Sequence, residues 1–520
     1  MMSEPFFKTD CPSCGAPVHA HSATAVTLVC GFCHSLLVRQ GAGIIDSGRD
    51  SALLEDFSPL QIGTSGTFAN RPFAIIGRLQ AKYDAGMWNE WYVQFEDGGN
   101  GWLSESGDQY VFTLPAAESL QEIPEFSGLV AGRSSLIYRN KRFWAADVRD
   151  IVLEQAAAQG ELPFAVPPQM KNQVADWRCE QIFLTLDYAS SPPEVFVGQG
   201  VKLADLQLGN TRSSEQVADS AGRLKGTRQA ESCPNCGSPV QWITGLTPSI
   251  LCPSCGSNLD ATEGKLELLE ANNRREAQAD AFTLKIGSEA RINNRTYTLI
   301  GAVRKDELEP EDAFNLMFGQ KPLGIVPVGR WTEYLLFEPQ AGFMWLVESG
   351  DGEWSVSETL NVWPRLYGDL FQPQGLPKLY DYGGRVVLAA GAFYWHIRQG
   401  DVDFYSDYRH NSNGKLCAES NRHEAAWSQS TTIPYRTVFE WFGIESNIPQ
   451  YSANMNADRP STGLMTLLII VFVIINVPAW LNMLASEEDI SLAAMLSMMV
   501  LYFLGKRGNV FSSDDDDDDE

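Results

Sequence analysis

Eight of the ten cysteines in the chain fall into two sets with the spacing of a metal site. In each set, two residues separate the cysteines of a pair, and 15 residues separate the two pairs. Two intervening residues make a tight knuckle that presents both thiolates to one metal ion, and four thiolates complete a tetrahedral coordination sphere. The sequence therefore predicts two structural zinc ions, each in a zinc ribbon. The ligands are Cys11, Cys14, Cys30 and Cys33 in the first ribbon, and Cys233, Cys236, Cys252 and Cys255 in the second.

Disulfide bonds are the alternative interpretation of these cysteines. We find no secretory signal and expect a reducing, cytosolic compartment, which favours zinc. Gly15, Gly237 and Gly256 follow their cysteines at points where the backbone must turn, whereas His34 follows Cys33. Neither 11–38 nor 233–260 contains Lys or Arg. A ribbon that binds phosphates needs cations on its surface, so we expect ribbons that face protein or are purely structural.

The composition agrees with a multidomain globular protein that does not bind nucleic acid. At about 100–200 residues per domain, 520 residues correspond to about three to five domains. Hydrophobic residues at 44% and charged residues at 20% exclude a wholly disordered chain. The net charge of −26 repels DNA and RNA. Part of it lies in an acidic tail, Asp514–Asp519 and Glu520, which we interpret as solvated chain.

The elements around the two ribbons are duplicated and are mainly strands. Residues 60–77 are repeated at 284–301, and 102–108 are repeated at 345–351. Both copies consist of short β-branched and aromatic runs bounded by Gly, Asn, Asp and Pro, with hairpin turns expected at Asn70 and Asn293. The predicted fold is mainly β: each ribbon precedes a β-domain that contains an SH3-like barrel. Helices are expected only at 267–281 and 438–442.

Three strings in the second copy resemble a known domain family. They are 391–401, 424–428 and 435–439, and in the first copy the barrel half and Trp102 with 105–107 agree with them. They resemble the bacterial domain of unknown function 4178, in two copies that cover roughly 58–205 and 282–445. The first copy departs from the pattern at 142–149. The resemblance implies partners in membrane-stress systems with polyamine-synthesis-like enzymes and phage-shock-type proteins, and implies no activity.

The C-terminal part is predicted to form a transmembrane hairpin. Residues 463–484 carry no charge and reach about 33 Å as a helix, enough for a bilayer core. Residues 490–504 reach only about 22 Å, and we favour a second crossing over an interfacial helix. Arg459, Lys506 and Arg507 flank the hairpin, and its turn has no Lys or Arg. The positive-inside rule then places both ends in the cytoplasm. The resemblance to a bacterial family implies that the membrane is the bacterial inner membrane.

The predicted domain order follows from these features. The segments are zinc ribbon 1 at 1–40, β-domain copy 1 at 58–207, a linker at 208–232, zinc ribbon 2 at 233–262, β-domain copy 2 at 282–445, the transmembrane hairpin at 463–504 and the acidic tail at 505–520.

The search for an active site gives candidates and no catalytic residue. Motifs of nucleotide-binding proteins, zinc proteases and serine hydrolases are missing from the sequence. A ligand pocket in copy 2 would use Trp345, Glu348, Asp351, His396 and Asp401, although Glu-Ser-Gly-Asp is also an ordinary turn. Three hypotheses remain: an adaptor that binds protein partners, a binding module or sensor for a cationic small molecule such as a polyamine, and an enzyme with a pocket around His396. Carboxylates and Trp faces suit a cationic ligand.

Overall fold

The computed structural model divides the chain into two compact units, 1–446 and 447–520. It describes residues 6–444 except for gaps at 41–42, 51–57, 84–85, 107–108, 155–156, 167–168, 214–215, 217–228, 243–248, 253, 256, 261–266, 271–281, 321, 323, 339–340, 369 and 396. The predicted hairpin and acidic tail lie outside the described residues. Within the described residues, no helix is long and apolar enough to cross a membrane.

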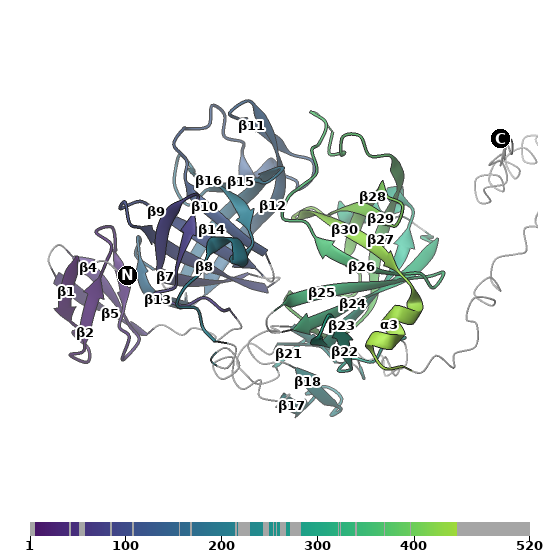
Figure 1. The fold of residues 1–520 in the computed structure, drawn as a ribbon, viewed down its shortest axis with the longest axis horizontal. Coiled ribbons are helices and arrows are strands. Elements are labelled where there is room, and N and C mark those ends of the chain that lie inside the picture. The colour runs from purple at the N-terminus through teal and green to yellow at the C-terminus, as the bar shows by residue number, and fades with distance from the viewer. Residues whose placement is uncertain are drawn as a thin grey trace, which may run out of the picture. The chain divides into compact units, whose positions relative to one another are not determined.

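The first half of the described chain contains ribbon 1 and a β-domain (Figure 1). Ribbon 1 comprises β1 (Phe7–Asp10), β2 (Pro17–Ala20), β3 (Thr27–Val29), β4 (Ser35–Gln40) and β5 (Gly43–Asp50). The β-domain comprises β6 (Ser65–Phe68), β7 (Arg71–Tyr83), β8 (Gly86–Phe95), β9 (Asn100–Ser106), β10 (Gln109–Pro115), η1 (Phe126–Gly128), β11 (Ser135–Tyr138), β12 (Lys141–Glu154), β13 (Ala157–Leu162), β14 (Gln169–Cys179), β15 (Ile182–Asp187), β16 (Glu194–Val201) and η2 (Leu203–Leu206).

The second half repeats this order. Ribbon 2 comprises β17 (Gln229–Ser232), β18 (Pro239–Trp242), β19 (Ser249–Leu251), β20 (Asn258–Asp260) and β21 (Glu267–Glu270). The second β-domain comprises β22 (Glu289–Ile292), β23 (Arg295–Leu308), α2 (Pro310–Met317), β24 (Gly329–Glu338), β25 (Gly342–Ser349), β26 (Trp354–Thr359), β27 (Lys378–Phe393), β28 (Val402–Asn411), β29 (Gly414–Ser420), β30 (Ala425–Ile433) and α3 (Tyr435–Trp441). The prediction of a mainly β fold is confirmed.

Each β-domain is built around one ring of antiparallel strands. In the second domain, the order β27-β28-β29-β30-β26-β25-β24-β23 closes because β23 also pairs with β27, which gives an eight-stranded barrel, named barrel 2. In the first domain, named barrel 1, the order is β12-β14-β15-β16-β10-β9-β8-β7-β13. The consecutive strands β12 and β13 stand at the two ends of this order, and together they correspond to the single long strand β27 of barrel 2. The last strand of the predicted SH3-like part is β10 in the first domain and β26 in the second. These strands pair with β16 and β30, so the SH3-like part is only half of a larger ring.

Local sequence explains the turns of these sheets. Ala69 and Asn70 between β6 and β7, and Asn293 and Asn294 between β22 and β23, all have positive φ. Two successive left-handed residues make the tight turn whose twist suits a two-residue hairpin, and Asn tolerates that conformation well. The two hairpin turns expected from the sequence are thus confirmed.

Both faces of β8 are buried at 91–93, which explains why this strand is apolar at successive positions. On β8, Trp91 and Val93 pack with the cluster that contains Phe73 and Phe112. Tyr92, on the other face of the same strand, packs with the cluster that contains Ile76. A strand between two apolar layers needs apolar residues at successive positions.

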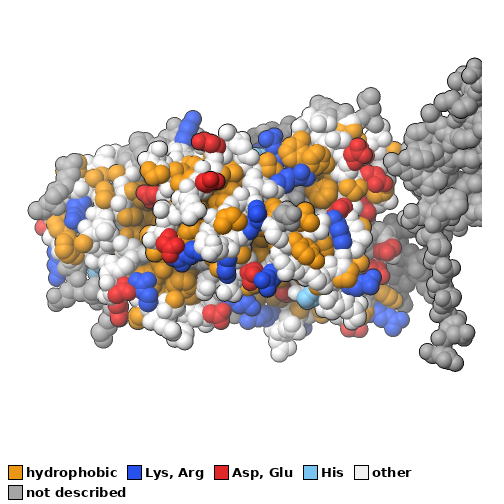
Figure 2. Space-filling model, turned by 90° about the horizontal axis from the view of Figure 1, so that it is seen from above, with side chains coloured by type: hydrophobic (Ala, Val, Ile, Leu, Met, Phe, Trp, Pro, Cys, Tyr) orange, Lys and Arg blue, Asp and Glu red, His pale blue; other side chains and the backbone are white. Residues whose placement is uncertain are grey.

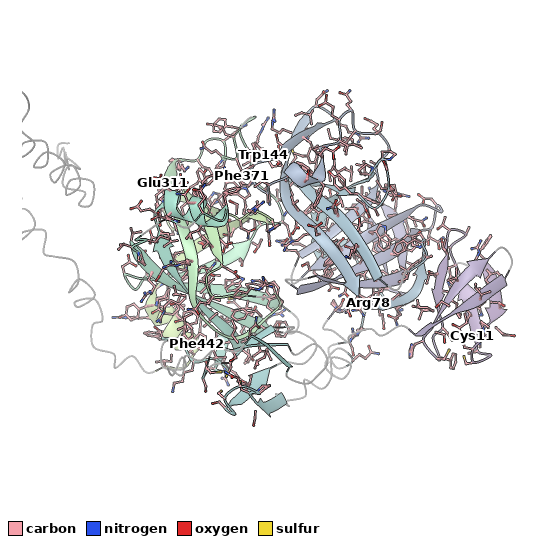
Figure 3. The ribbon with its side chains drawn as sticks, turned by 180° about the vertical axis from the view of Figure 1, so that it is seen from behind. Cys11, Arg78, Trp144, Glu311, Phe371 and Phe442 are labelled. Carbon is pink, nitrogen blue, oxygen red and sulfur yellow. The ribbon has the colours of Figure 1, made fainter. Side chains whose placement is uncertain are left out.

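The two barrels share an apolar core of their own. Trp144 of barrel 1 belongs to the same buried cluster as Trp363 and Trp427 of the second domain. Phe371 lies among them, with its ring centroid 5.6 Å from that of Trp144 and 5.5 Å from those of Trp363 and Trp427 (Figure 3). We name Trp144, Trp363, Phe371 and Trp427 the aromatic junction. It fixes the two domains to each other within the first unit.

Polar contacts surround the aromatic junction. Arg149 of β12 forms ion pairs with Asp147, at 2.8 Å, and with Glu424 of the second domain, at 2.8 Å. Burial raises the pKa of Asp147 to about 6, although the positive charge of Arg149 opposes the shift. Arg178 donates a hydrogen bond to the backbone oxygen of Asn361 at 2.6 Å.

The helix predicted at 267–281 is wrong in its described part. Residues 267–270 form β21, which pairs with β20 at the edge of ribbon 2, and 271–281 lie outside the described residues. Glu and Leu are good helix formers, but intrinsic propensity amounts to less than about 1 kcal/mol per residue, and strand pairing overrides it here. The second predicted helix, at 438–442, falls at α3.

Candidate metal centres and polar sites of the barrels

The eight predicted ligands lie together in two groups of four. In ribbon 1 the Sγ atoms of Cys11 and Cys33 are 3.7 Å apart, as are those of Cys14 and Cys30. Ribbon 2 repeats this arrangement, with 3.8 Å between Cys233 and Cys255 and 3.7 Å between Cys236 and Cys252. The residues of the two groups lie on the turns before β2, β4, β18 and β20.

These distances distinguish metal coordination from disulfide formation. Sulfur atoms about 2.3 Å from one zinc ion, at the corners of a tetrahedron, lie about 3.8 Å from one another. The sulfurs of a disulfide bond lie about 2.05 Å apart. All eight cysteines are free thiols in the structure. The four-thiolate groups therefore fit a metal ion such as zinc, which would have its coordination closed by protein and would act as a structural element.

Neighbouring side chains stabilise the thiolates. Ser35 lies 3.3 Å from the sulfur of Cys33, and Ser257 lies 3.2 Å from the sulfur of Cys255, two residues after the last cysteine in both ribbons. Hydrogen bonds to Ser35 lower the pKa of Cys33 to about 6. Burial raises the pKa of Cys255, but its bonds to Ser257 outweigh this and bring it to about 6. Serine at this position thus favours the charged, metal-binding form.

The knuckles require a left-handed residue after the pair of cysteines. Gly15 and Gly237 have φ values of 75° and 74°, and each donates its backbone N–H to the first cysteine of its pair at 2.8 Å. His34 occupies this position after Cys33 with φ of 61°, and its N–H bonds to the oxygen of Cys30 at 3.0 Å. The departure from glycine noted in the sequence therefore keeps the geometry and accepts backbone strain.

The pocket residues predicted in copy 2 lie in separate surroundings. Trp345 packs on Trp395, with centroids 5.5 Å apart, in the cluster around Phe393. Glu348 accepts hydrogen bonds from Tyr334 at 2.6 Å and Thr283 at 2.7 Å. Asp351 accepts one from Ser349, and Asp401 accepts one from the backbone of Arg398. His396 lies outside the described residues, and so the enzyme hypothesis built on it stays a prediction.

A polar cluster that sequence reasoning missed lies inside barrel 2. The ammonium group of Lys305, on β23, donates to the hydroxyl of Tyr405 at 2.6 Å. Three carboxylates lie around it: Glu333 at 3.4 Å, Asp403 at 3.5 Å and Glu419 at 3.6 Å. Glu333 lies on β24, the neighbour of β23, whereas Asp403 and Glu419 come from β28 and β29, which do not pair with β23. We name Lys305, Glu333, Asp403, Tyr405 and Glu419 the lysine cluster.

The charges of the lysine cluster determine its protonation. Burial alone would lower the pKa of Lys305, but the surrounding carboxylates outweigh burial and raise it above the ordinary value for lysine. The amine is therefore a charged ammonium and not a nucleophile. In barrel 1, Ala81 pairs with Trp88 as Lys305 pairs with Trp331, so alanine stands at the position of the lysine. For this reason, comparing the two copies in the sequence does not single out Lys305.

Two other polar pairs are present in both barrels. Trp88 donates its indole N–H to Glu90 at 2.7 Å, and Trp331 does so to Glu333 at 2.7 Å. Glu105 accepts from Trp91 at 2.9 Å, as Glu348 accepts from Tyr334. A Trp-x-Glu string in each copy was the available sequence signal.

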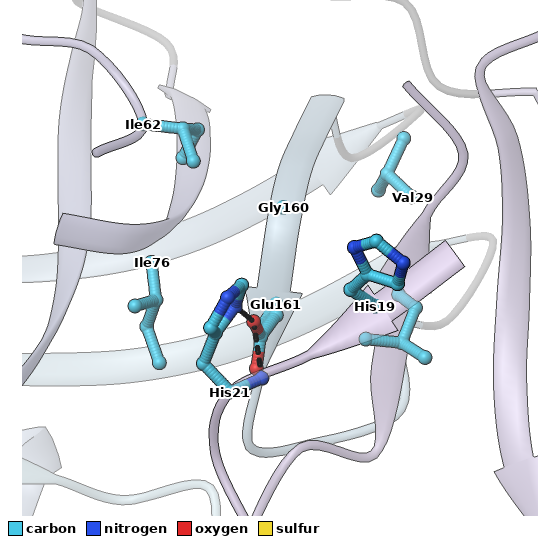
Figure 4. Close-up of a pocket in the computed structure, with 8 residues that line it drawn as sticks. His19, His21, Val29, Ile62, Ile76, Gly160 and Glu161 are labelled. Atoms are coloured by element: carbon cyan, nitrogen blue, oxygen red, sulfur yellow. Dashed lines mark hydrogen bonds and ion pairs between the residues drawn. The ribbon is translucent and has the colours of Figure 1, made fainter. Parts of the chain in front are cut away.

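A small cavity lies where ribbon 1 meets barrel 1 (Figure 4). Its volume is about 150 Å³, and its lining includes His19, His21, Ile76, Gly160 and Glu161. Glu161 accepts the backbone N–H groups of His21 and Ser22 at 2.8 and 2.9 Å, and its carboxylate lies 2.8 Å from Nδ1 of His21. The buried carboxylate is thus fully used in holding β2 and the following turn onto β13.

On the face in Figure 2, Lys and Arg side chains are interspersed with acidic and apolar ones.

One family model matches part of the chain. Residues 61–203 are similar to the family described as a domain of unknown function, DUF4178. The match runs from just before β6 to the start of η2 and thus covers barrel 1. No curated protein and no solved structure matches the chain.

Proposed function

We propose that the chain is a membrane-anchored cytoplasmic adaptor of bacteria that binds protein partners through its ribbons and β-domains. The observation that carries this proposal is Phe32, whose side chain is 74% exposed. It lies between Cys30 and Cys33 at the tip of a metal-binding knuckle. Aromatic residues are enriched in protein–protein interfaces, and a few residues of an interface contribute most of its binding energy.

The rest of the proposal concerns the metals and the second copy. In this proposal, both four-cysteine groups hold a structural zinc ion. The distances between their sulfur atoms favour this. Barrel 2 is a second copy of the same domain family, because its strand order, its hairpin turn and its Trp-x-Glu pair agree with those of barrel 1. The hairpin at 463–504 supplies the anchor, and a membrane-stress or polyamine-linked system is the setting that the family resemblance suggests.

The test is purification of the full-length protein in mild detergent, with identification and quantification of every co-purifying protein. Phe32→Ser is the test variant, and Ile137→Ser is the matched control because Ile137 is 53% exposed on barrel 1. We expect a stoichiometric partner that is retained by Ile137→Ser and lost from Phe32→Ser, with two zinc ions per chain in both. A wild-type protein that carries no stoichiometric partner, or equal loss in the two variants, contradicts the proposal.

A second candidate function is binding of a cationic small molecule such as a polyamine. The lysine cluster favours it, since three carboxylates there face one ammonium group and leave an excess of negative charge. Calorimetric titration of the full-length protein with spermidine tests it, using Glu419→Gln and the exposed Glu440→Gln as matched control. Binding that weakens with salt and with Glu419→Gln alone supports it, and an absence of heat contradicts it.

A further inference from the structure

In each half of the chain, one strand belongs both to the barrel and to the ribbon. In β13, Ala157–Gly160 pair with β7 of barrel 1, and the next residues, Glu161 and Leu162, pair with β3 of ribbon 1. In β27, residues 383–391 pair with β23 of barrel 2, and 391–393 pair with β19 of ribbon 2. The strand that closes each barrel therefore continues into the sheet of its ribbon.

The change of partner occurs at a glycine pair in both halves. Gly160 lies opposite Gly77, and Gly391 lies opposite Gly301. Gly160 and Gly391 have φ values of 70° and 93°. A Cβ atom on Gly160 would lie 2.2 Å from the backbone oxygen of Ile76, and one on Gly391 would lie 2.3 Å from that of Ile300. This close crossing admits only glycine, and it is built twice in one chain.

The ribbon strand at this joint leads directly to a metal ligand. β3 ends at Val29 and is followed by Cys30, and β19 ends at Leu251 and is followed by Cys252. In ribbon 2, Ala392 of β27 packs in the same cluster as Cys233, Cys252 and Cys255. The positions of β3 and β19 are thus fixed at one end by the four-cysteine group. Along their length they are fixed by pairing with β13 and β27.

The joint of ribbon 1 has further contacts across it. The N–H of Val26 bonds to the oxygen of Leu162 at 2.8 Å, and the hydroxyl groups of Thr24 and Tyr92 lie 3.1 Å apart. Glu161, adjacent to Gly160, holds His21 and Ser22 as described above (Figure 4). Loss of order in ribbon 1 would therefore leave Glu161 and Leu162 without their partner strand, while Ala157–Gly160 could still pair with β7.

We propose that metal occupancy of each ribbon controls closure of its neighbouring barrel, at the β7–β13 seam in barrel 1 and the β23–β27 seam in barrel 2. Folding of a small ribbon is coupled to metal binding, so a ribbon without metal loses the strand that supports the seam. The seam then opens locally, while the remaining strand pairs of the barrel persist. The inference rests on the metal sites and not on the adaptor role, and the partner experiment tests that role separately.

Hydrogen exchange of the full-length protein, followed by mass spectrometry, tests the proposal. Cys11→Ser is the test variant, Cys233→Ser is its counterpart in ribbon 2, and Cys179→Ser is the control because Cys179 belongs to neither group. Metal content is measured on each sample. We expect Cys11→Ser to lose one zinc ion and to exchange about tenfold faster or more in β7 and β13, with β23 and β27 unchanged. Cys233→Ser should show the reverse pattern.

Two results would overturn the proposal. The first is wild-type protection of the β7–β13 seam in a Cys11→Ser protein that has lost its metal. The second is equally fast exchange in β8, β9, β14 and β15, because this shows general unfolding rather than opening of one seam. If Cys11→Ser does not accumulate as folded protein, a chelator titration of the wild type decides: seam exchange must rise as metal is removed and fall when zinc is restored.

Discussion

Replacement of Phe371 by alanine should separate the two domains without unfolding either barrel. The Phe371 ring contacts three tryptophans at 5.5–5.6 Å, and each such aromatic pair contributes about 0.5–1.5 kcal/mol beyond the area that it buries. Truncation of a fully buried Phe costs about 3–5 kcal/mol, and Phe371 is only partly buried. Among the described residues, Nε1 of Trp363 and of Trp427 have no hydrogen-bond partner. Water that enters the cavity could bond to them and offset part of the loss.

We therefore expect Phe371→Ala to lower the free energy of local opening at the aromatic junction by about 2–4 kcal/mol. Hydrogen exchange of β12 and β30, which flank the junction, measures this change. Tyr367→Ala is the matched control because Tyr367 belongs to the same loop and is 47% exposed. A change below about 0.5 kcal/mol, or one equal to that of Tyr367→Ala, would show that the aromatic junction does not hold the domains together.

Three other perturbations test the sites described above. The pKa of Asp147 is raised to about 6 in the folded protein against about 3.9 when unfolded, so its ionisation destabilises the fold progressively between about pH 4 and 6. Asp147→Asn should have a higher free energy of unfolding in urea than wild type, and the difference should increase across that pH range. A difference that does not depend on pH would contradict the raised pKa of Asp147. His34→Gly should relieve the left-handed strain and increase zinc affinity of ribbon 1 about fivefold in a chelator competition, whereas His19→Gly, on strand β2, should not increase it. Lys305→Met leaves three carboxylates without their cation and should lower the free energy of unfolding of barrel 2 by about 3–5 kcal/mol at pH 8. The loss should be smaller at pH 5, because burial raises the pKa of Glu419 to about 7 and this carboxyl is then protonated. The exposed Lys285→Met should have little effect at either pH.

The features that could be predicted from sequence are those set by near neighbours in the chain. The cysteine spacing located both metal groups because a knuckle needs only two intervening residues. The turns at Asn70 and Asn293 could be predicted because Asn tolerates positive φ. In contrast, the closure of each ring depends on pairs such as β26 with β30, whose residues are more than 60 positions apart. No local preference specifies such a partner, and so only half of the barrel was expected.

Two residues of the candidate pocket lie on one strand, and the geometry of that strand separates their side chains. Trp345 and Glu348 are three residues apart on β25, and such residues point to opposite faces of a strand. Their partners, Trp395 and Tyr334, lie in different apolar clusters as a result. The alternation of side chains along a strand is enough by itself to separate these two residues. Lys305 is a different case, because its carboxylate partners come from β24, β28 and β29 and meet only inside the closed barrel.

The two halves of the chain serve as an internal comparison of what the fold requires. The barrel interiors differ, since Ala81 stands where Lys305 does, and the ribbon joints differ in side chains, since Glu161 stands where Ala392 does. The crossing glycines, the shared strand and the sequence position of the third cysteine are the same in both. A joint that keeps its backbone geometry while its side chains change is constrained by the coupling of ribbon to barrel and not by a particular ligand. The barrel interiors do not take part in this joint, and their side chains differ between the two copies, as Ala81 and Lys305 do.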